Sequence, residues 1–189
     1  MKTSRIITLA AIAASLAAVS CAPPPSAPQT TRLQVSSSLN NRDAKLSDSI
    51  FHEVNRYRAT KSASSMKRHA GLDRLAQGHA EYLRQHRGTF SVHGRNVSHF
   101  GFESRARAAN HGMGFIYLAE NVAAAKNDGA SGIVRLWAAS KSHELTMRSK
   151  YDFTGIGTVI DDDGMVFTVQ LFGTRTSSHM AMADRLRGF

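Results

Sequence analysis

The residues of this sequence that could carry chemistry are mainly histidines, together with one glutamate in an apolar segment. Nine histidines are present, but there is no His-Glu-x-x-His zinc motif, no Gly-x-Ser-x-Gly turn, no phosphate-binding loop and no dinucleotide fingerprint. Three polar residues lie among apolar neighbours, where burial would force each side chain to find a partner: His99, Glu120 and His143. They are far apart along the chain, so only the fold could bring them together.

Of the three residues, Glu120 most clearly needs a polar or charged partner. It lies inside the apolar segment 118–123, and a carboxylate at a half-buried position needs a cation, a metal or several hydrogen-bond donors. A protonated histidine would satisfy it, and the site would then be a polar network. The residues themselves leave these alternatives open.

Hydrophobic patterning predicts the elements that would position these residues. Apolar residues spaced by three and four indicate three helices, at 46–57, 73–87 and 133–140. Runs of β-branched and aromatic residues indicate three strands, at 117–123, 155–160 and 165–172. The last two strands are joined by Asp161-Asp-Asp-Gly164, which is typical of a tight antiparallel hairpin. This order predicts an α+β fold in which helices cover a small sheet.

The N-terminus has the features of a secretory signal. Lys2 and Arg5 precede an apolar run over 6–19, which is too short to span a bilayer comfortably. Small residues follow at Ala18 and Ser20, so we expect residues 1–20 to be a signal peptide.

The only cysteine, Cys21, directly follows this signal. Ala18-Val-Ser-Cys21 resembles the lipobox of bacterial lipoproteins, in which the cysteine is lipidated and becomes the new N-terminus. We expect lipidation at Cys21; ordinary cleavage after Ser20, which would leave a free thiol in a secreted or periplasmic protein, is the alternative. In a cell with two membranes, Ala22 would favour delivery to the outer membrane, by resemblance to known sorting rules.

Composition bounds the rest of the chain. All four prolines lie between residues 22 and 28, and the polar sequence that follows predicts an extended tether over 21–45, with one folded domain over 46–189. The 189 residues carry a net charge of +10, and removal of Lys2 and Arg5 with the signal lowers it to +8. This charge is compatible with binding to anionic envelope components such as lipopolysaccharide or anionic lipid, but we expect it to reflect the basic surface of an ordinary exported protein. Nucleic acid is not expected, because no basic motif interleaved with aromatic residues is present.

Five short motifs occur in order along the predicted domain. They are Ser98-His-Phe-Gly-Phe-Glu-Ser-Arg105, Ala119-Glu-Asn-Val-Ala123, Trp137-Ala-Ala-Ser-Lys-Ser-His143, Gly155-Ile-Gly157 and Val169-Gln-Leu-Phe-Gly173. Together they resemble the bacterial branch of the CAP superfamily, which covers cysteine-rich secretory proteins, antigen 5 and pathogenesis-related class 1 proteins. The resemblance spans 46–174 and implies a three-layer α-β-α sandwich with a small, mainly antiparallel sheet.

The resemblance also implies a surface cleft in which two histidines and two glutamates can hold a divalent metal. His99 and His143 match the histidines and Glu120 matches the first glutamate, whereas Ser140 stands where the second glutamate would be. A metal such as zinc, held by the two imidazoles, would lower the pKa of a bound water, and Glu120 could be a ligand, a base or an acceptor that orients an imidazole. His93 could replace His99 in this pair.

Two functions are compatible with these features. We expect an exported, lipid-anchored binding module for an envelope or lipid-like ligand, rather than an enzyme. The alternative is a metal-dependent hydrolase acting on peptide or cell-wall substrates. Ser140 is the nearest candidate nucleophile, three residues before His143 on a predicted helix, but no oxyanion hole can be recognised in the sequence.

Overall fold

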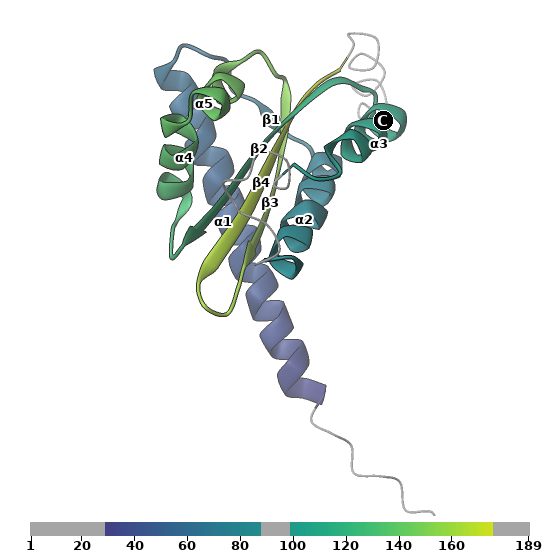
Figure 1. The fold of residues 1–189 in the computed structure, drawn as a ribbon, viewed down its shortest axis with the longest axis vertical. Coiled ribbons are helices and arrows are strands. Elements are labelled where there is room, and N and C mark those ends of the chain that lie inside the picture. Colours follow the sequence, from purple (N-terminus) through teal and green to yellow (C-terminus); the bar gives the residue numbers. More distant parts are fainter. Residues whose placement is uncertain (1–28, 88–98, 176–189) are drawn as a thin grey trace, which may run out of the picture.

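The computed structural model describes residues 29–87 and 99–175, and in these ranges it forms five helices and four strands (Figure 1). In chain order they are α1 (Gln29–Thr60), β1 (Lys67–Arg68), α2 (Ala70–Gln85), α3 (Phe102–Met113), β2 (Phe115–Lys126), α4 (Ala130–Ala139), α5 (Lys141–Arg148), β3 (Phe153–Ile160) and β4 (Met165–Arg175). The predicted signal peptide, Cys21 and His93 lie outside the described residues. Within the described ranges, no helix has the length and apolar character needed to cross a bilayer.

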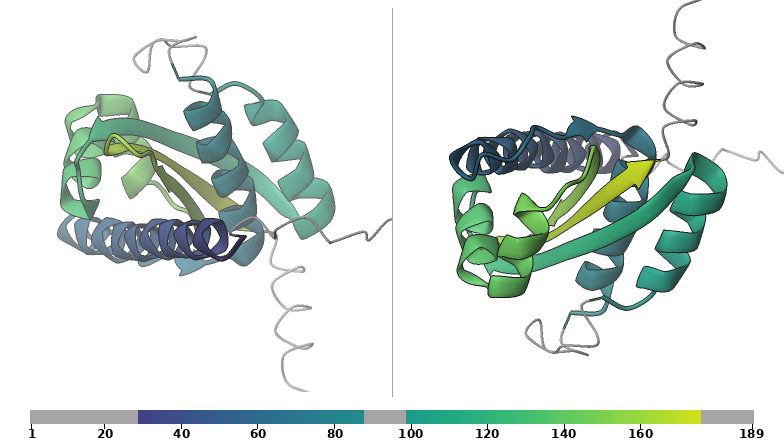
Figure 2. Two further views of the ribbon diagram at one scale, coloured as in Figure 1. Left: turned by 90° about the horizontal axis from the view of Figure 1, so that it is seen from below. Right: turned by 90° about the horizontal axis from the view of Figure 1, so that it is seen from above.

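The elements form a three-layer sandwich around a four-stranded sheet in the order β1-β3-β4-β2. Strand β1 pairs in parallel with β3, whereas the β3–β4 and β4–β2 pairs are antiparallel. Helices α1, α4 and α5 cover one face of the sheet, and α2 and α3 cover the other (Figure 2). The predicted α+β sandwich with a mainly antiparallel sheet is therefore confirmed.

Each face of the sheet carries its own hydrophobic core, because successive side chains of a strand point to opposite faces. On β4, Val169 and Leu171 belong to the cluster under α2 and α3, and Phe172 belongs to the cluster under α1, α4 and α5. The same alternation on β2 sends Val122 to the first cluster and Ala123 to the second. Glu120 and Asn121 must therefore face different layers.

Two glycines on β3 allow α2 to lie directly on the sheet. A Cβ atom at Gly157 would stand 2.1 Å from the backbone nitrogen of Gln77, and one at Gly155 would stand 2.2 Å from the backbone carbon of Leu72. Any larger residue at either position would push the helix away. The Gly155-Ile-Gly157 motif is thus a packing requirement of α2.

This close approach lets side chains bond the edge of β3 beyond the end of the short strand β1. Asp73 Oδ1 accepts the N–H of Ile156 at 2.8 Å, and Gln77 Oε1 accepts the N–H of Thr158 at 3.0 Å. Residues i and i+4 of a helix are about 6 Å apart and residues i and i+2 of a strand are about 6.6 Å apart, so the two spacings match. Edge N–H groups that are bonded in this way cannot pair with another chain.

The structure differs from the prediction at the start of the domain. Residues 29–45 belong to α1, where the sequence predicted an extended tether, and Asp43 Oδ1 accepts the N–H of Ile160 at 3.0 Å. The prediction was wrong because a shortage of large apolar residues argues against packing but not against a helix. No glycine or proline occurs from 29 to 60, so nothing in that stretch interrupts a helix. The N-terminal part of α1 extends beyond the sandwich (Figure 1).

Candidate functional site

The centre of the site is the carboxylate of Glu120, whose side chain is only 1% exposed. Its Oε2 accepts a hydrogen bond from Arg105 Nε at 2.8 Å, and its Oε1 accepts one from Arg105 Nη2 at 2.8 Å. His99 Nδ1 lies 2.9 Å from Oε1, and His79 Nε2 lies 4.0 Å from the same oxygen. A buried carboxylate is thus held by a two-pronged guanidinium contact and one imidazole.

Four different elements supply these side chains. Glu120 lies on β2 and faces α2 and α3, His79 comes from α2, and Arg105 comes from the first turn of α3. His99 lies in the turn that precedes α3, where Gly101 has φ +74°, a conformation that favours glycine. Arg105 Nη1 also donates to the Phe100 carbonyl at 2.9 Å, so one arginine ties the turn to the carboxylate.

Arg105 and His99 compensate the buried carboxylate of Glu120 for the loss of water. Removing a carboxylate from water is costly unless a charge and hydrogen bonds replace the water, and a two-pronged arginine contact supplies both. The sequence left a cation, a metal or several hydrogen-bond donors open as partners of Glu120, and the fold provides a cation. It is an arginine in addition to the histidine, and sequence reasoning did not identify Arg105 or His79.

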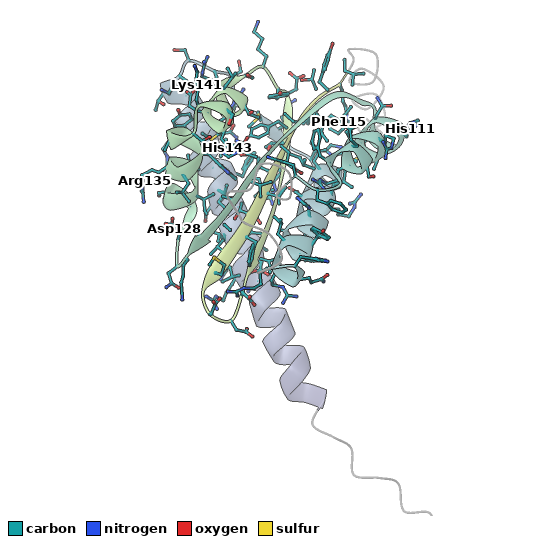
Figure 3. All side chains as sticks on the ribbon, viewed as in Figure 1. His111, Phe115, Asp128, Arg135, Lys141 and His143 are labelled. Atoms are coloured by element: carbon teal, nitrogen blue, oxygen red, sulfur yellow. The ribbon has the colours of Figure 1, made fainter. Side chains whose placement is uncertain are left out.

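His143 lies in the other layer of the sandwich. It stands in the first turn of α5, beside α4, and its backbone carbonyl accepts from Asn121 Nδ2 at 3.1 Å (Figure 3). Partial burial, and secondarily the nearby charge of His99, lower the pKa of His143 from its ordinary value of 6.5. The two imidazoles therefore lie close enough to interact electrostatically, although no hydrogen bond or ion pair joins His143 to Glu120 among the described residues.

The prediction that Ser140 and His143 share one helix was wrong, because the extended backbone of Ser140 ends α4 and begins α5. Its carbonyl accepts from the backbone N–H of Glu144 at 2.8 Å, and its Oγ lies 3.3 Å from Ser142 Oγ. Within the described residues no bond links Ser140 to the imidazole of His143, three positions later. The structure thus shows no nucleophile paired with a base at this place.

The residues that the family resemblance proposes for a metal do not fit one in this arrangement. In residues 29–87 and 99–175 there is no group of three or more His, Cys, Asp or Glu side chains placed to hold an ion. Both oxygens of Glu120 already accept from the Arg105 guanidinium, and that fixed positive charge would repel a divalent cation. His99 and His143 alone are fewer ligands than zinc sites use.

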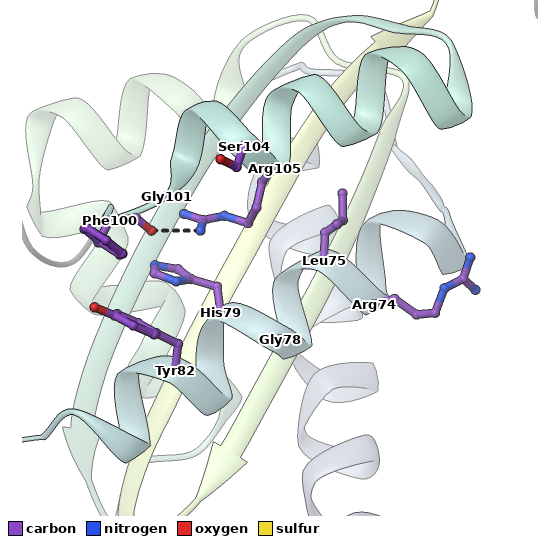
Figure 4. Close-up of a pocket in the computed structure, with 9 residues that line it drawn as sticks. All are labelled: Arg74, Leu75, Gly78, His79, Tyr82, Phe100, Gly101, Ser104 and Arg105. Atoms are coloured by element: carbon purple, nitrogen blue, oxygen red, sulfur yellow. Dashed lines mark hydrogen bonds between the residues drawn. The ribbon is translucent and has the colours of Figure 1, made fainter.

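A groove runs between α2 and α3, next to this network (Figure 4). It has a volume of about 360 Å³, within the size range of small-molecule sites. Arg105 and His79 meet in its middle, Tyr82 and Phe100 lie at one end, and Arg74 extends beyond the other end (Figure 4). Glu120 is therefore buried directly behind the floor of an open surface groove.

The fold and the motifs define a CAP domain. The model of the CAP family, described as the cysteine-rich secretory protein family, matches residues 51–172, so the chain belongs to this family. No curated protein matches the chain.

Solved structures show the same fold. An outer surface protein from Borrelia burgdorferi is similar with a TM-score of 0.54 and 19% identity, over 67% of this chain and 90% of that protein. An extracellular SCP-domain protein from Bacillus anthracis has a TM-score of 0.52 and 20% identity, over 72% of this chain and 43% of its own length. A cysteine-rich secretory protein from Staphylococcus aureus has a TM-score of 0.51 and 17% identity, over 70% and 39%. The chain therefore spans less than half of the last two proteins.

Proposed function

We propose that this protein is an exported CAP-domain binding module, anchored to the cell envelope by a lipid on Cys21, that takes an envelope or lipid-like ligand. The signal-like N-terminus supports export, and similar structures are described as outer surface or extracellular proteins. One acyl chain gives marginal membrane binding and several give firm anchoring, so a multiply acylated cysteine would hold the protein on a membrane.

The observation that carries the proposal is the engagement of Glu120 by Arg105 and His99. A catalytic carboxylate must be able to take a proton or bind a metal, and this one is buried against a permanent cation. The Glu120 network therefore acts as a scaffold that shapes the surface around it. Beside it lies an open groove with two aromatic rings at one end, which is suited to binding.

Two measurements test the proposal. The intact mass of protein extracted from native membranes should exceed that of the processed chain by the mass of its acyl groups, and Cys21→Ser should release the protein into the soluble fraction. An unmodified thiol in that material would rule out the anchor. For ligand binding, the purified protein should retain an envelope component that is detectable by mass spectrometry, and a ligand-free preparation that binds no envelope fraction would contradict the proposed function.

The alternative is a metal-dependent hydrolase acting on peptide or cell-wall material. It predicts that EDTA and His143→Ala each abolish turnover of peptidoglycan fragments. The binding module predicts no such turnover and no change in thermal stability upon adding EDTA or zinc. A zinc-induced rise in melting temperature that His143→Ala removes would favour the hydrolase.

A further inference from the structure

We propose that the groove between α2 and α3 binds a carbohydrate and that sugars with a carboxylate or phosphate group bind best. This inference rests on the proposed binding function and names the chemical class of its ligand. It depends on three features of the groove: a stacked aromatic end, hydrogen-bond donors in the middle, and an excess of positive charge.

The aromatic end is a stack built around Tyr82. The Tyr82 and Phe100 rings lie 5.3 Å apart and are inclined by only 14°, and His86 stacks on Tyr82 at 4.0 Å. Phe100 is 59% exposed, so much of its ring surface is open to a ligand in the groove. The negative face of such a ring attracts the weakly positive C–H groups that line one face of a sugar ring.

Hydrogen-bond donors line the same groove, from Arg105 and Ser104. Arg105 contributes Nε and Nη2 to Glu120 and one Nη1 N–H to the Phe100 carbonyl. A guanidinium has five N–H groups, so a second N–H of Nη1 is left without a partner among the described residues. Ser104 Oγ accepts from Arg107 at 3.1 Å, which leaves its own hydroxyl proton available.

The openness of the groove argues against an acyl chain. A lipid tail gains its binding energy from being enclosed, and a shallow surface groove would leave much of the chain in water. A tail lying over Arg105 would also remove water from a guanidinium N–H without replacing the hydrogen bond. A sugar can place one face on the aromatic rings and keep its other hydroxyls hydrated.

The positive charge of the groove favours acidic sugars over neutral ones. The nine residues that line the groove include Arg74 and Arg105 but no Asp or Glu, and Glu120 behind the floor neutralises only Arg105. Arg74 is exposed, makes no ion pair within the described residues and extends beyond one end of the groove, so its charge would attract an anionic substituent that reaches past that end.

The test is calorimetric titration of the folded protein with two defined probes, neutral chitotetraose and acidic tetragalacturonate. We expect the acidic probe to bind more tightly, Phe100→Ala to weaken binding at least tenfold, and Arg74→Gln to lower affinity for the acidic probe alone, about threefold. Leu136→Ala is the matched control, because it removes a 47% exposed leucine from α4 in the other layer and should change nothing. Both test residues are exposed, so the variants should fold.

The outcomes separate the carbohydrate from the broader function. If neither probe binds, or if Phe100→Ala binds like the wild type, the carbohydrate site is refuted. Vesicles of phosphatidylglycerol are titrated in parallel: vesicle binding without sugar binding would refute the carbohydrate site and leave an envelope-binding module. Absence of binding to both sugars and vesicles would count against both proposals.

Discussion

Replacing Gly157 by alanine should sharply destabilise the protein, because α2 rests on the bare backbone of β3. The new Cβ would stand 2.1 Å from Gln77 N and 2.3 Å from the backbone carbon of Ala76, where ordinary contacts are 3.4–4 Å. Both neighbours are helix backbone, so relief requires α2 to move by more than about 1 Å rather than a side chain to rotate.

The expected magnitude follows from what that movement breaks. Overpacking a well-packed core costs about 1–3 kcal/mol. Lifting α2 also stretches the Gln77–Thr158 hydrogen bond, which contributes about 1 kcal/mol. We therefore expect Gly157→Ala to lower the free energy of unfolding by about 3 kcal/mol.

Urea unfolding followed by circular dichroism measures this change, with Gly78→Ala as the matched control. Gly78 is exposed on the same helix, and a Cβ there would meet nothing within 4 Å. Alanine has the higher helix propensity, so this control should gain about 1 kcal/mol. A loss below about 1 kcal/mol for Gly157→Ala, or equal effects of the two substitutions, would refute direct contact between helix and strand.

Three further changes test other parts of the structure. Burial raises the pKa of Asp43 above 3.8, so the stability that this carboxyl contributes is present below that pH and is lost as the pH rises through the folded pKa. Asp43→Asn keeps an acceptor for the N–H of Ile160, so this variant should be more stable than the wild type at pH 7. Asp43→Ala lacks the acceptor and should be about 1 kcal/mol less stable than Asp43→Asn by urea titration. Arg58 is 1% exposed and donates to three backbone carbonyls, so Arg58→Met should cost about 3 kcal/mol in chemical unfolding, whereas Arg56→Met, whose side chain is 71% exposed, should cost less than about 0.5 kcal/mol. The lowered pKa of His143 contributes stability above pH 6.5 that is lost as pH falls through the folded pKa, so His143→Gln should flatten the acid limb of a melting-temperature profile, and an unchanged profile would contradict the burial of this imidazole.

Local patterns predicted much of the scaffold. The hairpin of β3 and β4, the strand β2 and the helices α2 and α4 were all expected, because periodicity and turn residues act over a few neighbouring positions. Helix α3 was missed, since its sequence has only alanines and two end residues to mark an apolar face. Strand β1 is two residues long and exists only through its pairing with β3.

The sequence by itself determined that Glu120 would be buried and would need a partner, and its motifs were sufficient to indicate the family. Only the tertiary structure decided that the partner is Arg105 and that His143 belongs to the opposite layer. The physical reason is that burial follows from the apolar neighbours of a residue, whereas a partner depends on which helix packs over which strand. That choice was made by contacts such as those of Gly155 and Gly157 with α2, between residues about 80 positions apart.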